Sequence, residues 1–287
     1  MSTRRRPSPP RNLARNSPPR RPTAPERARP RSPKPRQRGL GGEQVEGRQA
    51  VRETLLARRR KVHEIWLAND LDPAPIIDDI VELAHHQRVP VQEVARKRLD
   101  AEAHTDAPQG VLAKCAPIRE HDLDDLAKRQ KGKPLPFLVA LDGVTDPGNL
   151  GAVLRSADGA GATGIVLAKH RAVHVTPTVA KTAAGAIEYL PMTIVSGIPA
   201  ALMRLRELGV WIVGLDGDAP MSLFDLPAID DDPVCVVMGA EGTGLSRLVR
   251  QRCDVIVSIP MHGGVAALNV SAAAALACFE VARRRRA

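Results

Sequence analysis

The second half of the chain contains short, almost continuously apolar segments that alternate with helical patterns. Strands that are apolar along their whole length are buried on both faces, which is typical of a mainly parallel sheet covered by helices on each side. The sequence therefore predicts an α/β fold for this half. The expected strands are residues 137–141, 164–167, 192–195, 210–215, 234–238 and 255–259, and a last helix is expected over 268–284.

The first half of the chain shows a smaller alternation of strand and helix patterns. Strands are expected over 63–67, 89–94 and 110–116, and a helix over 76–86. Ordered structure is expected to begin near Glu46. Residues 130–136, QKGKPLP, combine charge, glycine and two prolines, which is typical of a linker. We therefore expect four parts, namely a tail over 1–40, a small α/β unit over 41–118, a linker over 119–136 and the larger α/β unit over 137–287.

The net charge of +10 is concentrated at the N-terminus. Residues 1–38 hold 13 of the 42 lysines and arginines, one acidic residue and ten prolines. Such a segment has too little apolar surface to offset its ordering entropy, so the tail is expected to be disordered. Its charge suits a polyanion such as RNA, although a solubilising extension explains it too. With 2% aromatic residues, contacts to RNA are expected from Arg, Lys and backbone groups.

The four cysteines are far apart in the sequence and lie in or beside apolar stretches, so they are expected to be reduced core thiols and not disulfides or metal ligands. No apolar run reaches the roughly 18 residues of a membrane span, and prolines interrupt the basic N-terminus without an apolar signal region after it. A cytoplasmic protein without a membrane partner or a metal is expected.

Residues 159–164, GAGATG, match the dinucleotide-binding fingerprint G-x-G-x-x-G. That fingerprint binds pyrophosphate only where it follows a strand and opens a helix. Here a helical pattern over 150–157 precedes the glycines and a strand over 165–167 follows. The order is reversed, so these glycines are expected to end a helix and to lead into a strand.

Three other glycine-bearing segments follow expected strands. Residues 141–155 place Asn149 near a helix start and Arg155 two turns later, residues 237–246 place Glu241 among three glycines, and residues 259–271 place Asn269 at a helix start. Ligands in open α/β sheets bind outside the carboxyl ends of the strands, so these loops are expected to form one pocket. Taken singly, each is explained as an ordinary turn, with Asn269 as a helix cap and Glu241 as a solvated acid.

At these residues the chain resembles the SpoU family of RNA ribose methyltransferases, within the knotted SPOUT superfamily. The family pattern D-P-x-N-x-G-x-x-x-R matches residues 146–155, G-x-E-x-x-G matches 239–244, and I-P-M with a downstream S-L-N-V-S matches 259–261 and 267–271. In the first half, GRQAV at 47–51 and PQGV at 108–111 resemble the small ribosomal-protein-like domain of rRNA-directed members. Two residues depart from the family, namely Pro108, where histidine is common, and Ala267, where serine is common.

The resemblance implies an enzyme that transfers a methyl group from S-adenosylmethionine to a ribose 2′-hydroxyl of RNA. It also implies a deep trefoil knot in the second half, a homodimer with each active site near the interface, and a small unit that binds the RNA substrate. The residues it implies for cofactor binding, largely through backbone groups, are Gly239, Ala240, Gly242, Gly244, Ile259, Met261 and Leu268.

Arg155 is the catalytic residue that the resemblance implies, together with Asn149, Glu241 and Asn269. A guanidinium resists deprotonation, so a general-base role is physically awkward. Placing the neighbouring RNA phosphate and stabilising a developing alkoxide are easier roles to defend. The two asparagines are expected to orient Arg155, the ligand or Glu241 by hydrogen bonds.

Three alternatives stay open. The substrate is expected to be large-subunit (23S) rRNA because of the additional first unit, but a tRNA-directed enzyme of the same family is an alternative. A non-catalytic ribosome-associated RNA-binding protein agrees with Ala267 and the basic tail, whereas intact Asn149, Arg155, Glu241 and Asn269 argue against it. A methyltransferase that protects its host from an antibiotic shares this architecture.

Overall fold

The computed structural model describes residues 39–170, 172–226 and 232–285. The disorder expected for the basic tail therefore falls on residues outside this part of the chain.

The second half forms a seven-stranded sheet in which every strand pairs in parallel with its neighbours. Its order is β7-β6-β5-β10-β8-β11-β9. The strands are β5 (Phe137–Leu141), β6 (Gly164–Ala168), β7 (Met192–Val195), β8 (Trp211–Leu215), β9 (Met221–Ser222), β10 (Val234–Met238) and β11 (Val255–Ser258). The six predicted strands are confirmed to within a residue or so at their ends. The additional strand β9 has two residues, too few to give a periodic pattern.

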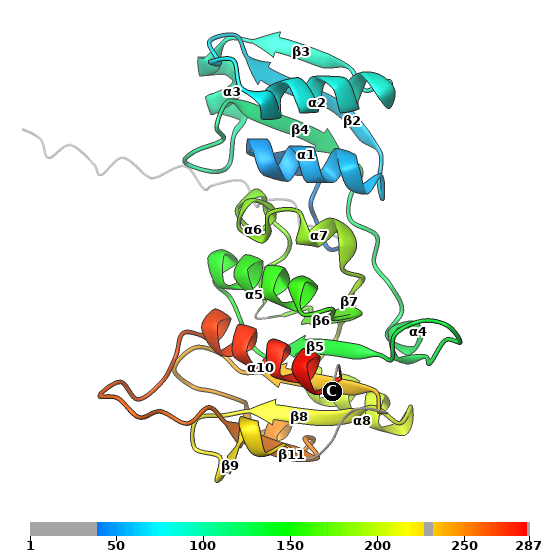
Figure 1. Ribbon diagram of the computed structural model, residues 1–287, viewed down its shortest axis with the longest axis vertical. Helices are drawn as coiled ribbons and strands as arrows, with labels where there is room; N and C mark the ends of the chain where they lie inside the picture. The colour runs from blue at the N-terminus through cyan, green and yellow to red at the C-terminus, as the bar shows by residue number, and fades with distance from the viewer. Residues whose placement is uncertain (1–38, 171, 227–231, 286–287) are drawn as a thin grey trace, which may run out of the picture. The chain divides into compact units, whose positions relative to one another are not determined.

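Both faces of this sheet are buried, as the apolar strands predicted. In β5, Phe137, Val139 and Leu141 belong to one core cluster, and Leu138 and Ala140 belong to the other. The first cluster lies under α5 (Pro147–Gly159) and α10 (Val270–Arg284), which pack against each other (Figure 1). The second cluster lies under α4 (Leu123–Ala127), α8 (Ile198–Glu207) and α9 (Arg247–Arg250).

The range expected as a linker, 119–136, contains α4. Leu126 and Ala127 of this helix are buried in the same core cluster as Leu138, so part of this range packs on the sheet. The remaining helical segments of the second half are α6 (Pro177–Ala183), α7 (Ala186–Tyr189) and the 3-10 turn η1 (Leu223–Asp225).

The glycines that match the dinucleotide fingerprint lie between a helix and a strand. Helix α5 ends at Gly159, Gly161 adopts a φ of 81°, and β6 begins at Gly164. This confirms the prediction that they end a helix and lead into a strand.

The first half forms a four-stranded sheet of order β1-β4-β2-β3, in which only β2 and β3 run parallel. Its elements are β1 (Gln44–Glu46), α1 (Arg48–Ala57), β2 (Val62–Ala68), α2 (Pro75–His86), β3 (Val91–Val94), α3 (Arg96–Glu102) and β4 (Val111–Cys115). The sequence predicted neither β1, which has three residues, nor α3, where only Leu99 is buried and no apolar stripe exists.

Ordered packing begins earlier than the expected Glu46. Leu40, within the expected tail, is 1% exposed and belongs to the core of the seven-stranded sheet. Its carbonyl accepts a hydrogen bond of 2.8 Å from the backbone N–H of Val175. A single apolar residue between Gly39 and Gly41 gives no periodic pattern, so the sequence did not predict this.

The two family-like segments of the first half meet at the start of α1. Gly47 supplies no capping side chain there, and the side-chain oxygen of Gln109 accepts the backbone N–H of Arg48 at 3.1 Å instead. Gly47 in turn donates to the carbonyl of Val111 at 3.0 Å. Gln109 therefore has a structural role in joining this loop to α1.

All four cysteines are free, and Cys115, Cys235 and Cys278 are buried, as predicted. In the described part of the chain, no helix has the length and apolar character needed to cross a bilayer.

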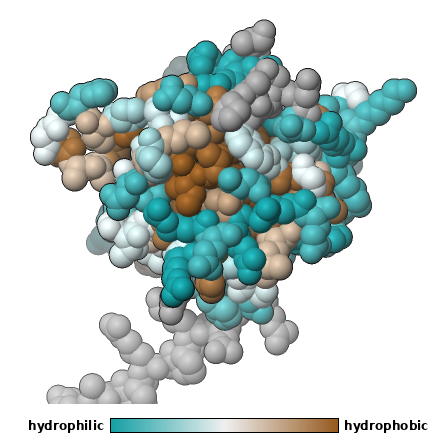
Figure 2. All heavy atoms as spheres, turned by 90° about the horizontal axis from the view of Figure 1, so that it is seen from below, coloured by the Kyte–Doolittle hydropathy of each residue, from teal (hydrophilic) through white to brown (hydrophobic). Residues whose placement is uncertain are grey.

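Several large apolar side chains are exposed. On α10, Leu276 is 42% and Phe279 53% exposed. Met221 of β9 is 38% exposed, and the view from the end of the molecule where β9 and β11 lie shows apolar residues gathered among hydrophilic ones (Figure 2). Exposed apolar groups of this kind are typical of surfaces that contact a partner.

Candidate functional site

Helix α5 begins directly after the loop that follows β5. Asp146 is its N-cap, and its carboxylate accepts the backbone N–H of Asn149 at 2.7 Å. Pro147 occupies the first turn, where its missing N–H costs nothing. The DPGN sequence therefore forms a capped helix start that holds Asn149 at the end of β5.

The three strand-end segments meet in one hydrogen-bonded group, the Asn–Glu–Asn triad of Asn149, Glu241 and Asn269. The amide nitrogen of Asn269 donates to the side-chain oxygen of Asn149 at 3.0 Å and to Glu241 Oε1 at 2.9 Å. Asn149 Nδ2 donates to Glu241 Oε2 at 3.2 Å. Both carboxylate oxygens of Glu241 are therefore held by amides from two other segments.

Asn269 is also the N-cap of α10. Its Oδ1 accepts the backbone N–H of Ser271 at 2.8 Å and lies 2.6 Å from the Ser271 hydroxyl. The capping explanation of this residue and the site explanation hold together, because the oxygen caps the helix while the nitrogen binds the triad.

Arg155 makes no hydrogen bond to any member of the triad. It is exposed on α5, following Asn149 and Ala152 at intervals of three residues along the outer face of the helix. Within the described residues, Arg155 makes no hydrogen bond or ion pair, so its guanidinium is available to an external ligand. Within one chain, the candidate site thus consists of the triad and of Arg155, which lies on the same helix as Asn149.

Beside the triad lies a cavity of about 330 Å³, within the usual range of small-molecule sites. Its walls come from the second and third strand-end segments, the residues that follow β8, Arg250 and the start of α10. The first segment, which carries Asn149, contacts Glu241 and Asn269 but does not line the cavity. All seven residues expected to bind the cofactor line it, namely Gly239, Ala240, Gly242, Gly244, Ile259, Met261 and Leu268, and Glu241 and Ala267 line it as well.

The loop after β10 closes on itself at this cavity. Ala240 and Gly244 exchange backbone hydrogen bonds of 3.0 and 2.9 Å. A Cβ on Gly239 would lie 2.2 Å from the carbonyl carbon of Gly244, and Gly242 and Gly244 adopt φ values of 78° and 64°. Glycine is therefore required here so that backbone groups alone form this wall.

A charged pair in the same wall was not predicted from the sequence. Asp216, at the end of β8, is 8% exposed and forms an ion pair with Arg250 of α9. Burial raises the pKa of Asp216, but the hydrogen bond and charge of Arg250 outweigh it and hold the pKa below its usual range. The segment LDG at 215–217 is itself a strand end with a polar residue and a glycine, which was the available signal.

The cavity combines a backbone wall with carboxylates. Asp216, Asp218 and Glu241 line it together with one cation, Arg250. A ligand that fits would be a small organic molecule with cationic character, recognised mainly by backbone N–H and C=O groups.

Two family models match the chain. The model described as the SpoU rRNA Methylase family matches residues 136–279, and that described as RNA 2′-O ribose methyltransferase substrate binding matches residues 44–121. Both cover the segments on which the motifs lie.

Two similar proteins match this chain over almost their whole length. A 23S rRNA (guanosine-2′-O-)-methyltransferase, RlmB, from Pseudomonas syringae is 40% identical over 248 residues, covering 85% of this chain and 97% of that protein. RlmB of Pseudomonas aeruginosa is 40% identical over 246 residues, with the same coverage of both proteins.

Among solved structures, the SpoU methyltransferase AviRb from Streptomyces viridochromogenes in complex with AdoMet superposes with a TM-score of 0.71 and 28% identity. The match covers 85% of this chain and 90% of that one. The family models, the relatives and the structural match agree, and the chain belongs to the SpoU rRNA methylase family.

Proposed function

We propose that this protein transfers a methyl group from S-adenosylmethionine to a ribose 2′-hydroxyl of large-subunit (23S) rRNA. The observation that carries the proposal is the glycine-walled cavity beside the triad of Asn149, Glu241 and Asn269. Membership of the SpoU family and 40% identity to two 23S rRNA methyltransferases support the substrate.

The cavity fits S-adenosylmethionine by shape and charge. Gly239 packs so closely on the backbone of Gly244 that no side chain fits between them, so backbone groups form this wall. The carboxylates of Asp216 and Glu241 suit a ligand that carries a sulfonium and an ammonium group. Gly239, Ala240, Gly242, Gly244, Ile259, Met261 and Leu268 would hold it. The bound cofactor supplies an electrophilic methyl group.

The polar residues of the chain position the reacting oxygen. Glu241, held by Asn149 and Asn269, presents a fixed carboxylate in the wall of the cavity. Arg155 binds a phosphate next to the target ribose and stabilises negative charge that develops on the 2′-oxygen. Holding the reacting groups in line supplies much of the rate enhancement. The proton that the 2′-hydroxyl loses passes to water. Ala267 lines the cavity, so the serine hydroxyl common there is dispensable in this account.

Two measurements test the proposal. Titration calorimetry should give S-adenosylmethionine binding, which a purely structural RNA-binding protein would lack. Incubation of purified rRNA and tRNA with labelled donor should label large-subunit rRNA. Label on tRNA alone would make it a tRNA-directed enzyme, and no transfer to either RNA would overturn the proposal.

The domain organisation that we propose follows the sequence boundaries, with an RNA substrate-binding unit over 41–118 and a methyltransferase unit over 137–287. The two family models support it, since they match 44–121 and 136–279. We also propose the deep trefoil knot of this superfamily. The strand order supports the knot. Strand β10 lies between β5 and β8, although both precede it in the chain, and α10 then packs on α5.

A homodimer is part of the same proposal. The exposed Leu276 and Phe279 lie on α10, which packs beside the helix carrying Arg155, so a second copy covering them would bring an additional surface to the site. Light scattering at micromolar concentration should give twice the chain mass, and a monomer would refute this part. We propose a cytoplasmic location as well, which a ribosomal RNA substrate supports.

A further inference from the structure

A buried ion pair joins the two halves of the chain, and neither the motifs nor the cavity accounts for it. Arg60 lies between α1 and β2, and Glu188 lies on α7, 128 residues later. Their side chains are 6% and 1% exposed. Burying two charges is costly unless geometry and further hydrogen bonds compensate, so this arrangement calls for a reason beyond stability.

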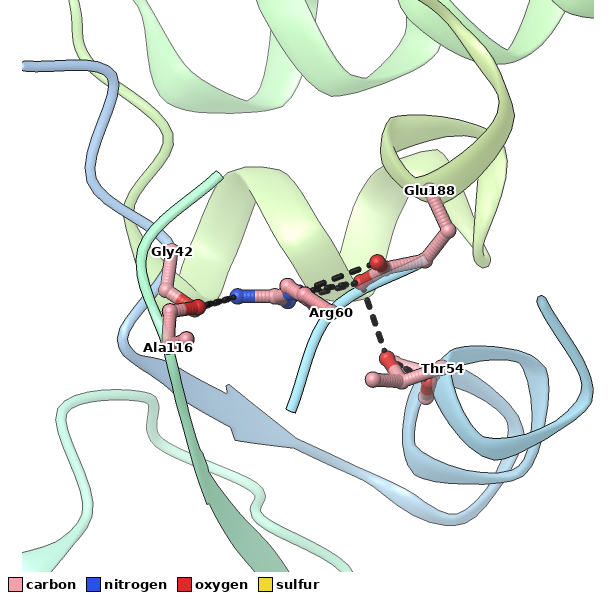
Figure 3. A network of polar contacts seen from close by, with 6 residues as sticks. Gly42, Thr54, Arg60, Ala116 and Glu188 are labelled. Carbon is pink, nitrogen blue, oxygen red and sulfur yellow. Dashed lines mark hydrogen bonds and ion pairs between the residues drawn. The ribbon is translucent and has the colours of Figure 1, made fainter. Parts of the chain in front are cut away.

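Every contact of this pair crosses or borders the junction between the halves (Figure 3). Arg60 Nε donates to both oxygens of Glu188 at 3.2 and 3.0 Å, and Nη2 donates to Oε1 at 2.6 Å. Its other nitrogen, Nη1, donates to the carbonyls of Ala116, at 2.9 Å, and Gly42. The Thr54 hydroxyl lies 3.0 Å from Glu188 Oε1. Arg60 therefore binds both chain segments that connect the halves as well as the catalytic half itself.

Neighbouring contacts fix the same junction. A Cβ on Gly185, which has a φ of 96°, would lie 2.4 Å from Cβ of Glu53, so the turn between α6 and α7 rests directly on α1. Lys181 of α6 donates to the carbonyl of Ala107 at 2.7 Å. The first half is thus held at several points by one pair of short helices.

These short helices also touch the helix of the site. A Cβ on Gly151 of α5 would lie 2.6 Å from Cβ of Thr182 and 2.9 Å from the carbonyl oxygen of Val179, both on α6. Asn149 and Arg155 lie on the same helix as Gly151. The position of the first half is therefore transmitted through one layer of packing to the helix that carries Asn149 and Arg155.

We propose that Arg60 and Glu188 are positioning residues, which fix the substrate-binding half on α6 and α7 so that RNA held there presents one ribose to the site on α5. This rests on the proposed RNA methyltransferase function. The two halves then form one rigid body. The distance between the RNA-binding surface of the first half and the cavity of the second half selects the nucleotide that is methylated.

The test uses the full chain with Glu188→Gln, which keeps the side-chain shape and removes the charge, and Arg60→Lys, which keeps the charge and removes the fork. Asp79→Asn is the matched control, because it breaks the Arg52–Asp79 pair, which is partly exposed and lies within the first half. Spin labels at Glu82→Cys and Met203→Cys, both exposed positions, report the distance between the halves. Burial raises the pKa of the Cys115 thiol to about 11 and of the Cys253 thiol to about 12, so the engineered cysteines react first.

We expect one narrow distance distribution for the wild type and the control, and a broadened one for both variants. The KM for rRNA should rise about 10-fold or more in the variants, while the Kd for S-adenosylmethionine stays within about twofold of the wild type. Unchanged distances and an unchanged KM in either variant would overturn the proposal. A wild type that methylates no RNA would refute the proposed function, and the distance distributions would still decide whether the pair fixes the halves.

Discussion

The side chain of Asn269 combines two roles that sequence patterns treat as alternatives. Its oxygen caps α10 through Ser271, and its nitrogen binds Asn149 and Glu241. Helix capping fixes the rotamer of the side chain, so the nitrogen is already oriented when a ligand arrives. At the residue scale, the site is thus preorganised by local backbone requirements.

Arg155→Ala should abolish methylation while leaving the Kd for S-adenosylmethionine nearly unchanged. Arg155 lies outside the residues that line the cavity and acts only on the RNA, so a loss of turnover of at least about 10²–10³-fold is expected. Single-turnover kinetics and calorimetry measure the two effects. Arg204→Ala, on α8 across the sheet, is the control and should keep activity. Equal activity of Arg155→Ala and the wild type would contradict the assignment.

Glu46 makes stability depend on pH. Burial raises the pKa of this carboxyl, but hydrogen bonds from Thr105, His104 and Gln44 outweigh it and hold the pKa below its usual range. A lowered pKa contributes stability that is present above the unfolded value of about 4.3 and is lost as the pH falls through the folded value.

Glu46→Gln should therefore lower the free energy of unfolding at pH 7 by about 1–3 kcal/mol and flatten its decline below pH about 4.3. Urea unfolding across that range measures both effects, with the exposed Glu43→Gln as control. A decline as steep as in the wild type would show that another group is responsible.

Much of the site was predictable from residue patterns, because strand ends of a parallel sheet share one edge. The meeting of Asn149, Glu241 and Asn269 follows from that rule. The Asp216–Arg250 pair was missed because its strand end carries no family motif. Arg60 and Glu188 were not predictable, since an ion pair across 128 residues leaves no periodic or spacing signal.

At the element scale, the contact of α5 with α6 depends on a missing side chain. Gly151→Ala would place a Cβ 2.6 Å from Thr182 and 2.9 Å from the carbonyl of Val179, so the helices must separate. We expect a loss of about 1–3 kcal/mol in unfolding free energy, with a fall in activity because Asn149 and Arg155 move with the helix.

Gly159→Ala on the same helix is the matched control. Its Cβ would meet only Phe279 at 3.7 Å, an ordinary contact, so the better helix propensity of alanine should leave stability equal or higher. Thermal unfolding compares the two variants. Similar melting temperatures for both would contradict the close packing of α5 on α6.

The sequence predicted the longer helices and the buried strands better than the shortest elements. The buried strands of the large sheet were predicted because each is an almost continuously apolar run, and helices such as α2 because they contain several turns of apolar pattern. Short elements such as β1, β9 and α3 were not, since their existence depends on neighbours that pair with or cover them. Leu40 belongs to the same class, because its burial is decided by Val175.

At the scale of the whole molecule, the excess positive charge lies in the N-terminal tail, whereas the residues expected to select the ribose lie in the rest of the chain. Residues 1–38 contribute thirteen cations against one acid, whereas the rest of the chain has 29 basic and 31 acidic residues. Deleting 1–38 should weaken RNA binding and reduce the dependence of log K on log salt concentration, because fewer counterions are released. The methylated nucleotide should stay the same. Filter binding at several salt concentrations measures the slope, and an unchanged slope would exclude the tail from RNA contact.

The central claim concerns the atom that receives the methyl group. rRNA labelled by the enzyme from S-adenosylmethionine should contain one position that resists alkaline cleavage, because a methylated 2′-oxygen cannot attack the neighbouring phosphate. That position should lie in large-subunit rRNA, and Arg155→Ala should leave it cleavable. Label found on a base, in RNA that alkali cleaves at every nucleotide, would contradict the account.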